Sequence, residues 1–147
     1  MEQTGCGCPP TMGTGRVHHA IVTVNDMTRS GPFYEWLMPR LGYTTSWSYE
    51  GSTGFLSPAG SFWLKPADPR YAGDTFSKDR VGLCELAFAA ASRDDVDALH
   101  RALVERGVPI LDPPQEYPQY VPGYYAVFFT DPDGIKLELV HIPGLPS

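Results

Sequence analysis

The sequence predicts an α+β fold in which two βαβββ modules share one domain. The chain has 147 residues and is 42% hydrophobic, which suits one globular domain with its own core. A strand, a helix and three short strands are predicted in the same order in each half. The halves also keep their spacing. The segment "HAIVTVND" from His19 matches "ELAFAAAS" from Glu85 at an interval of 66 residues, and the helix-ending Gly42 and Gly107 are 65 residues apart.

The first module is predicted over about residues 16–66. The β-branched segment 17–24 predicts a strand, and apolar residues spaced from Phe33 to Leu41 predict a helix that ends at Gly42. Pro39 should loosen the last turn of this helix, because proline removes one helical hydrogen bond. Glycine and proline then separate three short strands, which are predicted at 43–49, 54–56 and 61–65. The polar, irregular segment 66–80 predicts a loop.

The second module is predicted over about residues 81–142. A strand at 83–89 precedes a helix that begins after Ser92, a typical N-cap, and carries an apolar stripe before Gly107. Further strands are predicted at 108–111, 124–129 and 135–141, with a Pro/Tyr-rich link after the first and a turn at 131–134 before the last. Residues 1–15 and 143–147 contain glycine and proline without periodicity and predict flexible tails.

Composition excludes several classes of partner. The net charge of -6 and the absence of a Lys/Arg run argue against nucleic acid, which binds clustered cations. No apolar run approaches the roughly 20 residues that cross a bilayer, and the first residues do not have the pattern of a signal peptide. We therefore expect a cytoplasmic protein. Three cysteines, two of them in the predicted tail (Cys6 and Cys8), do not predict a disulfide framework.

Alternation along the strands predicts that each sheet has one apolar face and one open face. The open faces carry His19, Glu85 and Glu138. An ionisable side chain in mid-sheet is costly to bury unless it is paired or binds a metal, so these faces predict a functional cavity. One histidine and two carboxylates suit a divalent Zn, Ni, Mn or Fe ion. In the alternative interpretation His19 is structural, and the glutamates line a polar cleft or pair with Lys136 and Arg80.

The first module is expected to lack a matching carboxylate. An interval of 74 residues between "PAGSFWL" and "PDGIKLE" places Leu64 where the second module has Glu138. Leucine cannot bind a metal ion. The three remaining protein ligands would leave positions open for water and substrate, as Lewis-acid catalysis requires.

Aromatic residues provide candidate ligand contacts. The segment "EYPQYVPGYY" has the composition of a lid, and within it Tyr120 and Tyr124 are the candidates for contact with a ligand. Packing in the core and loops is the other interpretation of these tyrosines. Trp63 joins the candidates because it adds an aromatic surface beside the acidic one.

Three motifs carry a family resemblance: "HHAIVTVNDMTRSGPFYEWLMPRLGY", "ELAFAAASRDDVDALHRALVERGV" and "GYYAVFFTDPDGIKLELV". The chain resembles the vicinal oxygen chelate superfamily, which includes glyoxalase I, bleomycin-resistance proteins and extradiol dioxygenases, from Val17 to His141. The resemblance implies a cupped, half-open mixed barrel around one divalent metal ion, completed as a homodimer that takes a small-molecule substrate. It assigns His19, and not its neighbour, and Glu138 as metal ligands. Glu85 stands where relatives commonly have histidine.

Three functions follow from this resemblance. The leading one is a glyoxalase-like, metal-dependent lyase or isomerase that acts through a metal-stabilised enediolate, with Glu85 or Glu138 as the base. The alternative is a small-molecule binding protein of the bleomycin-resistance type, which needs no metal. The third is an Fe(II) dioxygenase, which is less supported because those enzymes use two histidines and one carboxylate. Lactoylglutathione lyase activity is less supported because that enzyme has a carboxylate where this chain has Leu64.

Overall fold

A computed structural model describes residues 15–145. The predicted N-terminal tail lies outside this range except for Gly15, as do Cys6 and Cys8, whereas the predicted C-terminal tail is described as far as Leu145. In chain order the elements are β1 (His19–Val24), α1 (Met27–Leu37), the 3-10 helix η1 (Met38–Leu41), β2 (Thr45–Tyr49), β3 (Ser52–Ser57), β4 (Gly60–Pro66), the 3-10 helix η2 (Pro69–Tyr71), β5 (Leu86–Ala89), α2 (Arg93–Arg106), β6 (Ile110–Glu116), β7 (Tyr125–Thr130) and β8 (Lys136–His141).

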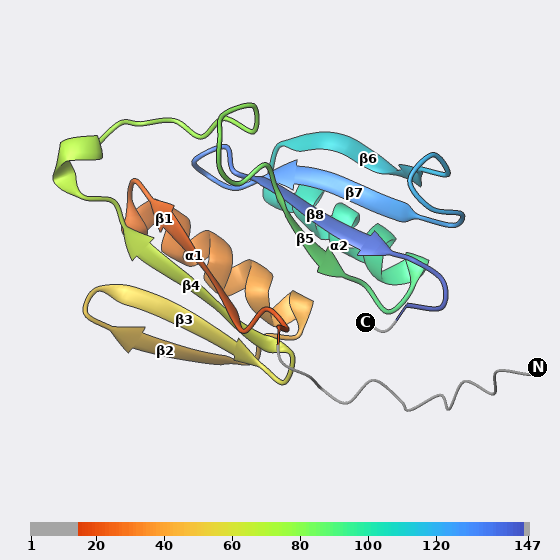
Figure 1. The fold of residues 1–147 in the computed structure, drawn as a ribbon, viewed down its shortest axis with the longest axis horizontal. Coiled ribbons are helices and arrows are strands. Elements are labelled where there is room, and N and C mark those ends of the chain that lie inside the picture. The colour runs from red at the N-terminus through yellow and green to blue at the C-terminus, as the bar shows by residue number, and fades with distance from the viewer. Residues whose placement is uncertain (1–14, 146–147) are drawn as a thin grey trace, which may run out of the picture.

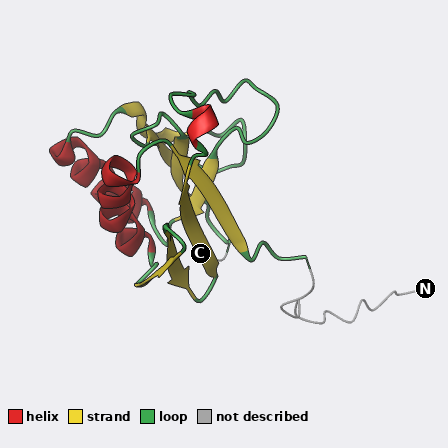
Figure 2. Ribbon diagram, turned by 90° about the vertical axis from the view of Figure 1, so that its left-hand side faces the viewer, coloured by secondary structure: helices red, strands yellow, loops and turns green. Residues whose placement is uncertain are grey.

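The strands form two four-stranded mixed sheets, ordered β1-β4-β3-β2 and β5-β8-β7-β6. In each sheet the first strand pairs in parallel with the last, and the other pairs are antiparallel. The sheets lie next to each other (Figure 1), and both long helices cover the same side of them (Figure 2). The predicted α+β fold with two βαβββ modules is therefore confirmed, and the sheets do not close into a barrel.

Local sequence signals set the ends of helix α1. The Asp26 side chain accepts a hydrogen bond from the Thr28 N–H at 2.8 Å and so caps the first turn. The helix changes to the 3-10 form at Met38, immediately before Pro39, as the sequence predicts. Gly42 then ends it with φ 86°, a conformation that glycine adopts without strain.

The second helix follows its predicted pattern. The Ser92 hydroxyl accepts a hydrogen bond from the Asp95 N–H at 3.2 Å, and Gly107 ends the helix with φ 76°. Between them Val96, Leu99 and Leu103 are buried. The apolar stripe therefore faces the sheet, so that α2 covers one face of this sheet and leaves the other face uncovered by the helix.

Strand β6 is longer than the sequence predicts. It continues from Ile110 through Pro113 and Pro114 to Glu116, in the segment expected to be a link. Prolines are tolerated there because β6 is an edge strand and its pairing with β7 is irregular between Asp112 and Gln115.

One buried cluster includes residues of both modules, among them Val22, Leu37 and Phe62 of the first and Val96, Leu103 and Phe129 of the second. Polar contacts also cross the junction. The Arg29 guanidinium forms an ion pair with Asp133 at 3.0 Å, and the Arg106 guanidinium donates to the Pro32 carbonyl at 3.4 Å. The two modules therefore hold their open sheet faces in a set relation to each other.

Candidate functional site

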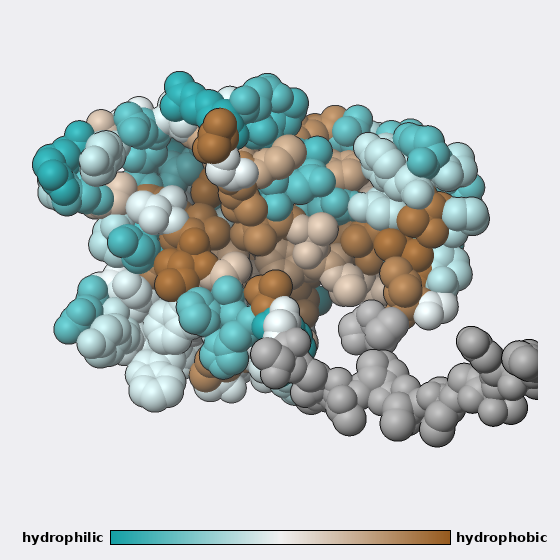
Figure 3. Space-filling model, in the orientation of Figure 1, coloured by the Kyte–Doolittle hydropathy of each residue, from teal (hydrophilic) through white to brown (hydrophobic). Residues whose placement is uncertain are grey.

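The open faces are the sheet faces away from the helices. Along β1, Val22 and Val24 are buried on the helix side, while His19, Ile21 and Thr23 are exposed on the other. Figure 3 views these faces, where hydrophobic surface gathers across the middle and hydrophilic surface surrounds it. The alternation predicted from the sequence thus places His19 on an open face.

The register of β4 corrects one prediction. Leu64 is fully buried, on the core side of its sheet. Ile21 pairs with Trp63 in the first sheet, as Ala87 pairs with Glu138 in the second, so Trp63 is the counterpart of Glu138. The interval between matching residues of β4 and β8 is therefore one residue longer than the sequence predicts. The reason is the preceding turn: the β3–β4 turn is tight, with Ser57 paired to Gly60, whereas Thr130 pairs with Lys136 across a longer turn.

Trp63 has a defined position on the first open face. A Cβ atom added to Gly54, its neighbour on β3, would lie 2.7 Å from three atoms of the indole ring. The ring therefore lies directly over the glycine, and its Nε1 donates to the Ser61 hydroxyl at 3.1 Å. Trp47 pairs with Gly54 from the other side and is 61% exposed. The first open face is thus an aromatic surface.

Glu138 is the buried acid of the second open face. It is 1% exposed, and its Oε1 accepts a hydrogen bond from the Tyr124 hydroxyl. Burial raises the pKa of Glu138 above its ordinary value, although Tyr124 and Lys136 oppose the shift. Burial and the adjacent carboxylate likewise raise the pKa of Tyr124, so its hydroxyl remains a donor.

Glu85 lies immediately before β5 and forms an ion pair with Lys136. The Lys136 Nζ is 2.6 Å from Glu85 Oε2, with the two side chains 22% and 33% exposed. The same ammonium group lies 4.4 Å from the centre of the Phe128 ring. Pairing of a candidate glutamate with Lys136 was the alternative interpretation of the sequence, and for Glu85 it is confirmed.

Three tyrosines cover this face beside Glu138. Tyr117 and Tyr120 stack with ring centres 5.5 Å apart, and Tyr124 packs edge-on against both. Tyr117 also packs edge-on against Phe128. Tyr120, a candidate for contact with a ligand, is the outermost ring at 60% exposed. Tyr117, on which Tyr120 stacks, belongs to the same aromatic segment "EYPQYVPGYY".

His19 lies apart from the carboxylates. Its exposed ring is 3.0 Å from His18, measured between the two Nδ1 atoms. Within residues 15–145 no group of three His, Cys, Asp or Glu side chains is arranged to hold a metal ion. The chain therefore gathers Glu85 and Glu138 but does not bring His19 to them. As arranged here, with Glu85 paired to Lys136, the predicted donor set does not fit a metal ion.

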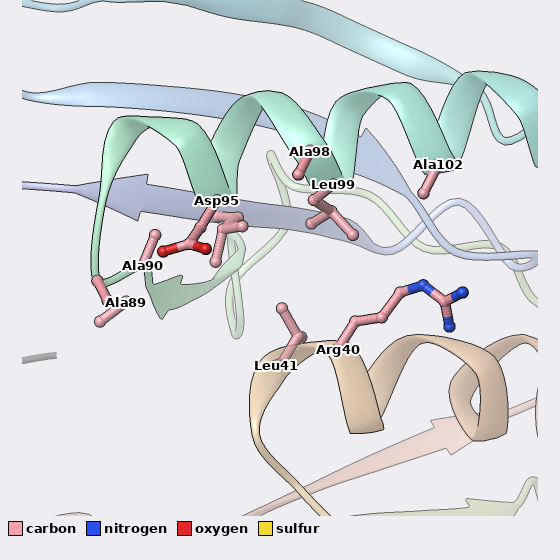
Figure 4. Close-up of a pocket in the computed structure, with 10 residues that line it drawn as sticks. Arg40, Leu41, Ala89, Ala90, Asp95, Ala98, Leu99 and Ala102 are labelled. Atoms are coloured by element: carbon pink, nitrogen blue, oxygen red, sulfur yellow. The ribbon is translucent and has the colours of Figure 1, made fainter.

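A separate groove of about 490 Å³ lies between the modules. Arg40 and Leu41 face residues of α2 across it, and several alanines line its walls (Figure 4). None of the candidate site residues lines this groove. The candidate chemistry is therefore confined to the open sheet faces.

Comparison with known proteins establishes the family. The model of the Glyoxalase/Bleomycin resistance protein/Dioxygenase superfamily matches residues 16–139. The chain belongs to this superfamily, as its motifs predicted.

Individual relatives support the same assignment. The uncharacterized protein YqjT of Bacillus subtilis (strain 168) is 31% identical over 124 residues, which cover 84% of this chain and 97% of that protein. The crystal structure of a candidate glyoxalase from Bacillus halodurans is 35% identical with a TM-score of 0.75, over 88% of this chain and 97% of that one. A glyoxalase/bleomycin resistance protein from Albidiferax ferrireducens T118 is 29% identical with a TM-score of 0.71, over 86% and 98%.

No helix among residues 15–145 is long and apolar enough to cross a membrane.

Proposed function

We propose that the chain is a small-molecule binding protein of the bleomycin-resistance type, which holds an aromatic, positively charged ligand on its open sheet faces. The buried carboxylate of Glu138 carries this proposal. It is 1% exposed and lies beside the tyrosines of the second face. Keeping a carboxyl group in such a place is costly for folding, so it is expected to serve the bound ligand.

The charges of the site favour a cation. An ionised carboxylate can only accept hydrogen bonds, so a ligand at Glu138 must donate one or carry positive charge. The chain as a whole has a net charge of -6, which attracts cations to it. Lys136 balances one of the two glutamates through its ion pair with Glu85. One carboxylate therefore remains for the ligand.

The aromatic residues favour a flat ligand. Trp63 offers its indole ring on the first open face, and Tyr120 is the outermost ring of the tyrosine stack on the second. A ligand ring that displaces Tyr120 and stacks on Tyr117 in its place would recover the stacking energy that the two tyrosines lose. A positive charge over such rings gains a further cation–π attraction.

A homodimer is part of the proposal. Ile21, Trp47 and Tyr49 are large, exposed side chains on one sheet, and a second copy of the chain would shield them from water. Sedimentation equilibrium measures the mass directly, and a monomer across the micromolar range would contradict this part. A cytoplasmic location stays a prediction from the sequence.

The binding test uses three bicyclic ring systems of similar shape: 1-methylquinolinium, 1-methylnaphthalene and 1-naphthoate. Quenching of tryptophan fluorescence reports binding. We expect the cation to bind at least about tenfold more tightly than the anion, and Glu138→Gln to abolish this preference. Glu105→Gln removes an equal charge from the exposed side of α2 and should leave the preference intact. Equal affinity of the wild type for all three probes would contradict the proposal.

The second candidate is the glyoxalase-like lyase or isomerase. One observation favours it: burial raises the pKa of Glu138, which suits a general base that removes a proton next to a carbonyl group. In this interpretation His19, Glu85 and Glu138 would hold a Zn, Ni, Mn or Fe ion, which would supply Lewis-acid chemistry, but the observed ion pair of Glu85 with Lys136 does not fit that ion. Exchange of solvent deuterium into an α-hydroxyketone, lost in Glu138→Gln, would favour the enzyme.

A further inference from the structure

We propose that the ammonium group of Lys136 takes the place of the metal ion in this chain, so that the second open face functions without a divalent cation. The proposal concerns the contacts that Glu85, Lys136 and Glu138 make. It rests on the proposed function only in its choice of face. Its test measures metal uptake and not ligand binding, so either proposal can fail while the other holds.

The ion pair between Lys136 and Glu85 occupies one of the candidate metal ligands. Lys136 Nζ lies 2.6 Å from Glu85 Oε2, and each side chain is about two-thirds or more shielded from water. A metal ion that took Glu85 as a ligand would have to break this pair. It would then leave an unpaired ammonium group beside a dication, and the two positive charges would repel each other in a partly buried site.

Lys136 is also held in place. It lies two residues from Glu138 on β8, and alternation along a strand puts both side chains on the same face. Its ammonium group also packs over the Phe128 ring at 4.4 Å. Phe128 pairs with Glu138 across the β7–β8 ladder, so ring, ammonium and carboxylate form one packed unit.

The identity of residue 85 agrees with this role of Lys136. A neutral histidine at this position would offer a metal a nitrogen ligand and would have no charge to attract Lys136. Glutamate instead gives the lysine a partner of opposite charge. The remaining candidate, His19, contacts His18 and is not grouped with the two carboxylates in the chain. The identity of residue 85 and its ion pair therefore both indicate that Lys136, and not a metal ion, is the partner of this side chain.

The experiment measures binding of Zn²⁺, Ni²⁺ and Mn²⁺ to the full chain, purified without chelators or a polyhistidine tag. Titration calorimetry gives affinity, and elemental analysis gives content. We expect the wild type to retain no stoichiometric metal. Lys136→Met should gain at least about tenfold in affinity, because it removes the competing cation. Glu85→His combined with Lys136→Met should bind more tightly still.

Control variants keep the test decisive. Lys65→Met removes an exposed lysine from β4 of the other sheet and should leave metal affinity unchanged. Lys136→Gln provides a second neutral variant in case Lys136→Met does not fold, and circular dichroism checks folding of each. Near-stoichiometric metal in the wild type would overturn the proposal. So would folded Lys136 variants whose metal affinity equals that of the wild type.

Discussion

The Tyr34 hydroxyl donates a hydrogen bond to Asp131 Oδ2 at 2.9 Å, which joins helix α1 of the first module to the turn before β8 in the second. Both side chains are buried. The other oxygen of Asp131 accepts from the N–H groups of Asp133 and Ile135, each at 2.8 Å. Burial raises the pKa of Asp131, and these hydrogen bonds oppose the rise. Asp131 therefore organises the turn and ties it to the neighbouring module.

Tyr34→Phe should destabilise the fold. The change leaves Asp131 Oδ2 buried without its donor, which costs about 1 to 3 kcal/mol in the free energy of unfolding. Urea denaturation followed by circular dichroism measures the loss. The ring itself remains, stacked on Phe62 at 5.1 Å, so the effect reports the hydroxyl alone.

Tyr71→Phe serves as its control, because Tyr71 is 56% exposed at the end of η2. Its stability should remain within about 0.5 kcal/mol of the wild type. If Tyr34→Phe were equally harmless, the bond to Asp131 would not hold the modules together.

Much of the fold could be predicted because local signals determine it. Ser92 and Gly107 mark the ends of α2, and Gly42 ends the first helical segment. The register of β4 could not be predicted in the same way. This register depends on the number of residues in the β3–β4 turn. Because that turn is short, the counterpart of Glu138 is Trp63 and not the predicted Leu64.

The site was only partly predictable from the sequence. Strand alternation places His19 and Glu138 on open faces, because a period of two is a local property. Whether His19 approaches the two carboxylates depends on how the modules pack, which strand patterns do not encode. The hydrogen bond from Tyr124 to Glu138 likewise depends on how the connection between β6 and β7 packs against β8.

Glu138→Gln should stabilise the chain at neutral pH. Because burial raises the pKa of Glu138 in the folded state, the folded chain holds this proton at pH values where the unfolded chain has lost it. Folding stability from this group is therefore present at low pH and decreases as pH rises from about 4.5, the ordinary value, through the folded pKa. The neutral side chain of Glu138→Gln does not undergo this loss.

The measurement is urea denaturation of wild type and Glu138→Gln from pH 4 to pH 8. The difference in unfolding free energy should favour the variant increasingly as pH rises and then level off. A difference that is independent of pH would show that Glu138 titrates normally in the folded chain.

Tyr124→Phe should weaken binding of 1-methylquinolinium and move its pH dependence. The Tyr124 hydrogen bond lowers the pKa of Glu138, so its loss raises that pKa further and leaves less carboxylate at a given pH. We expect about fivefold weaker binding at pH 7, about 1 kcal/mol, and a binding profile that begins at higher pH.

Tyr125→Phe is the matched control, since the Tyr125 hydroxyl donates to Asp97 at 2.6 Å and not to Glu138. It should leave both the affinity and the pH profile unchanged. An unshifted profile in Tyr124→Phe would mean that Tyr124 contributes only packing.

Gly54→Ala should displace Trp63. The new Cβ would lie 2.7 Å from the indole ring, closer than real contacts allow, so either the ring or strand β3 must move. Overpacking of this kind costs about 1 to 3 kcal/mol of stability. Tryptophan emission should shift and affinity for 1-methylquinolinium should decrease, because the first open face loses its flat ring.

Gly31→Ala is the comparison: nothing lies within 4 Å of its added Cβ in helix α1, so it should be neutral or stabilising by roughly 1 kcal/mol. Should both variants keep the wild-type emission and affinity, Trp63 would have no part in the site.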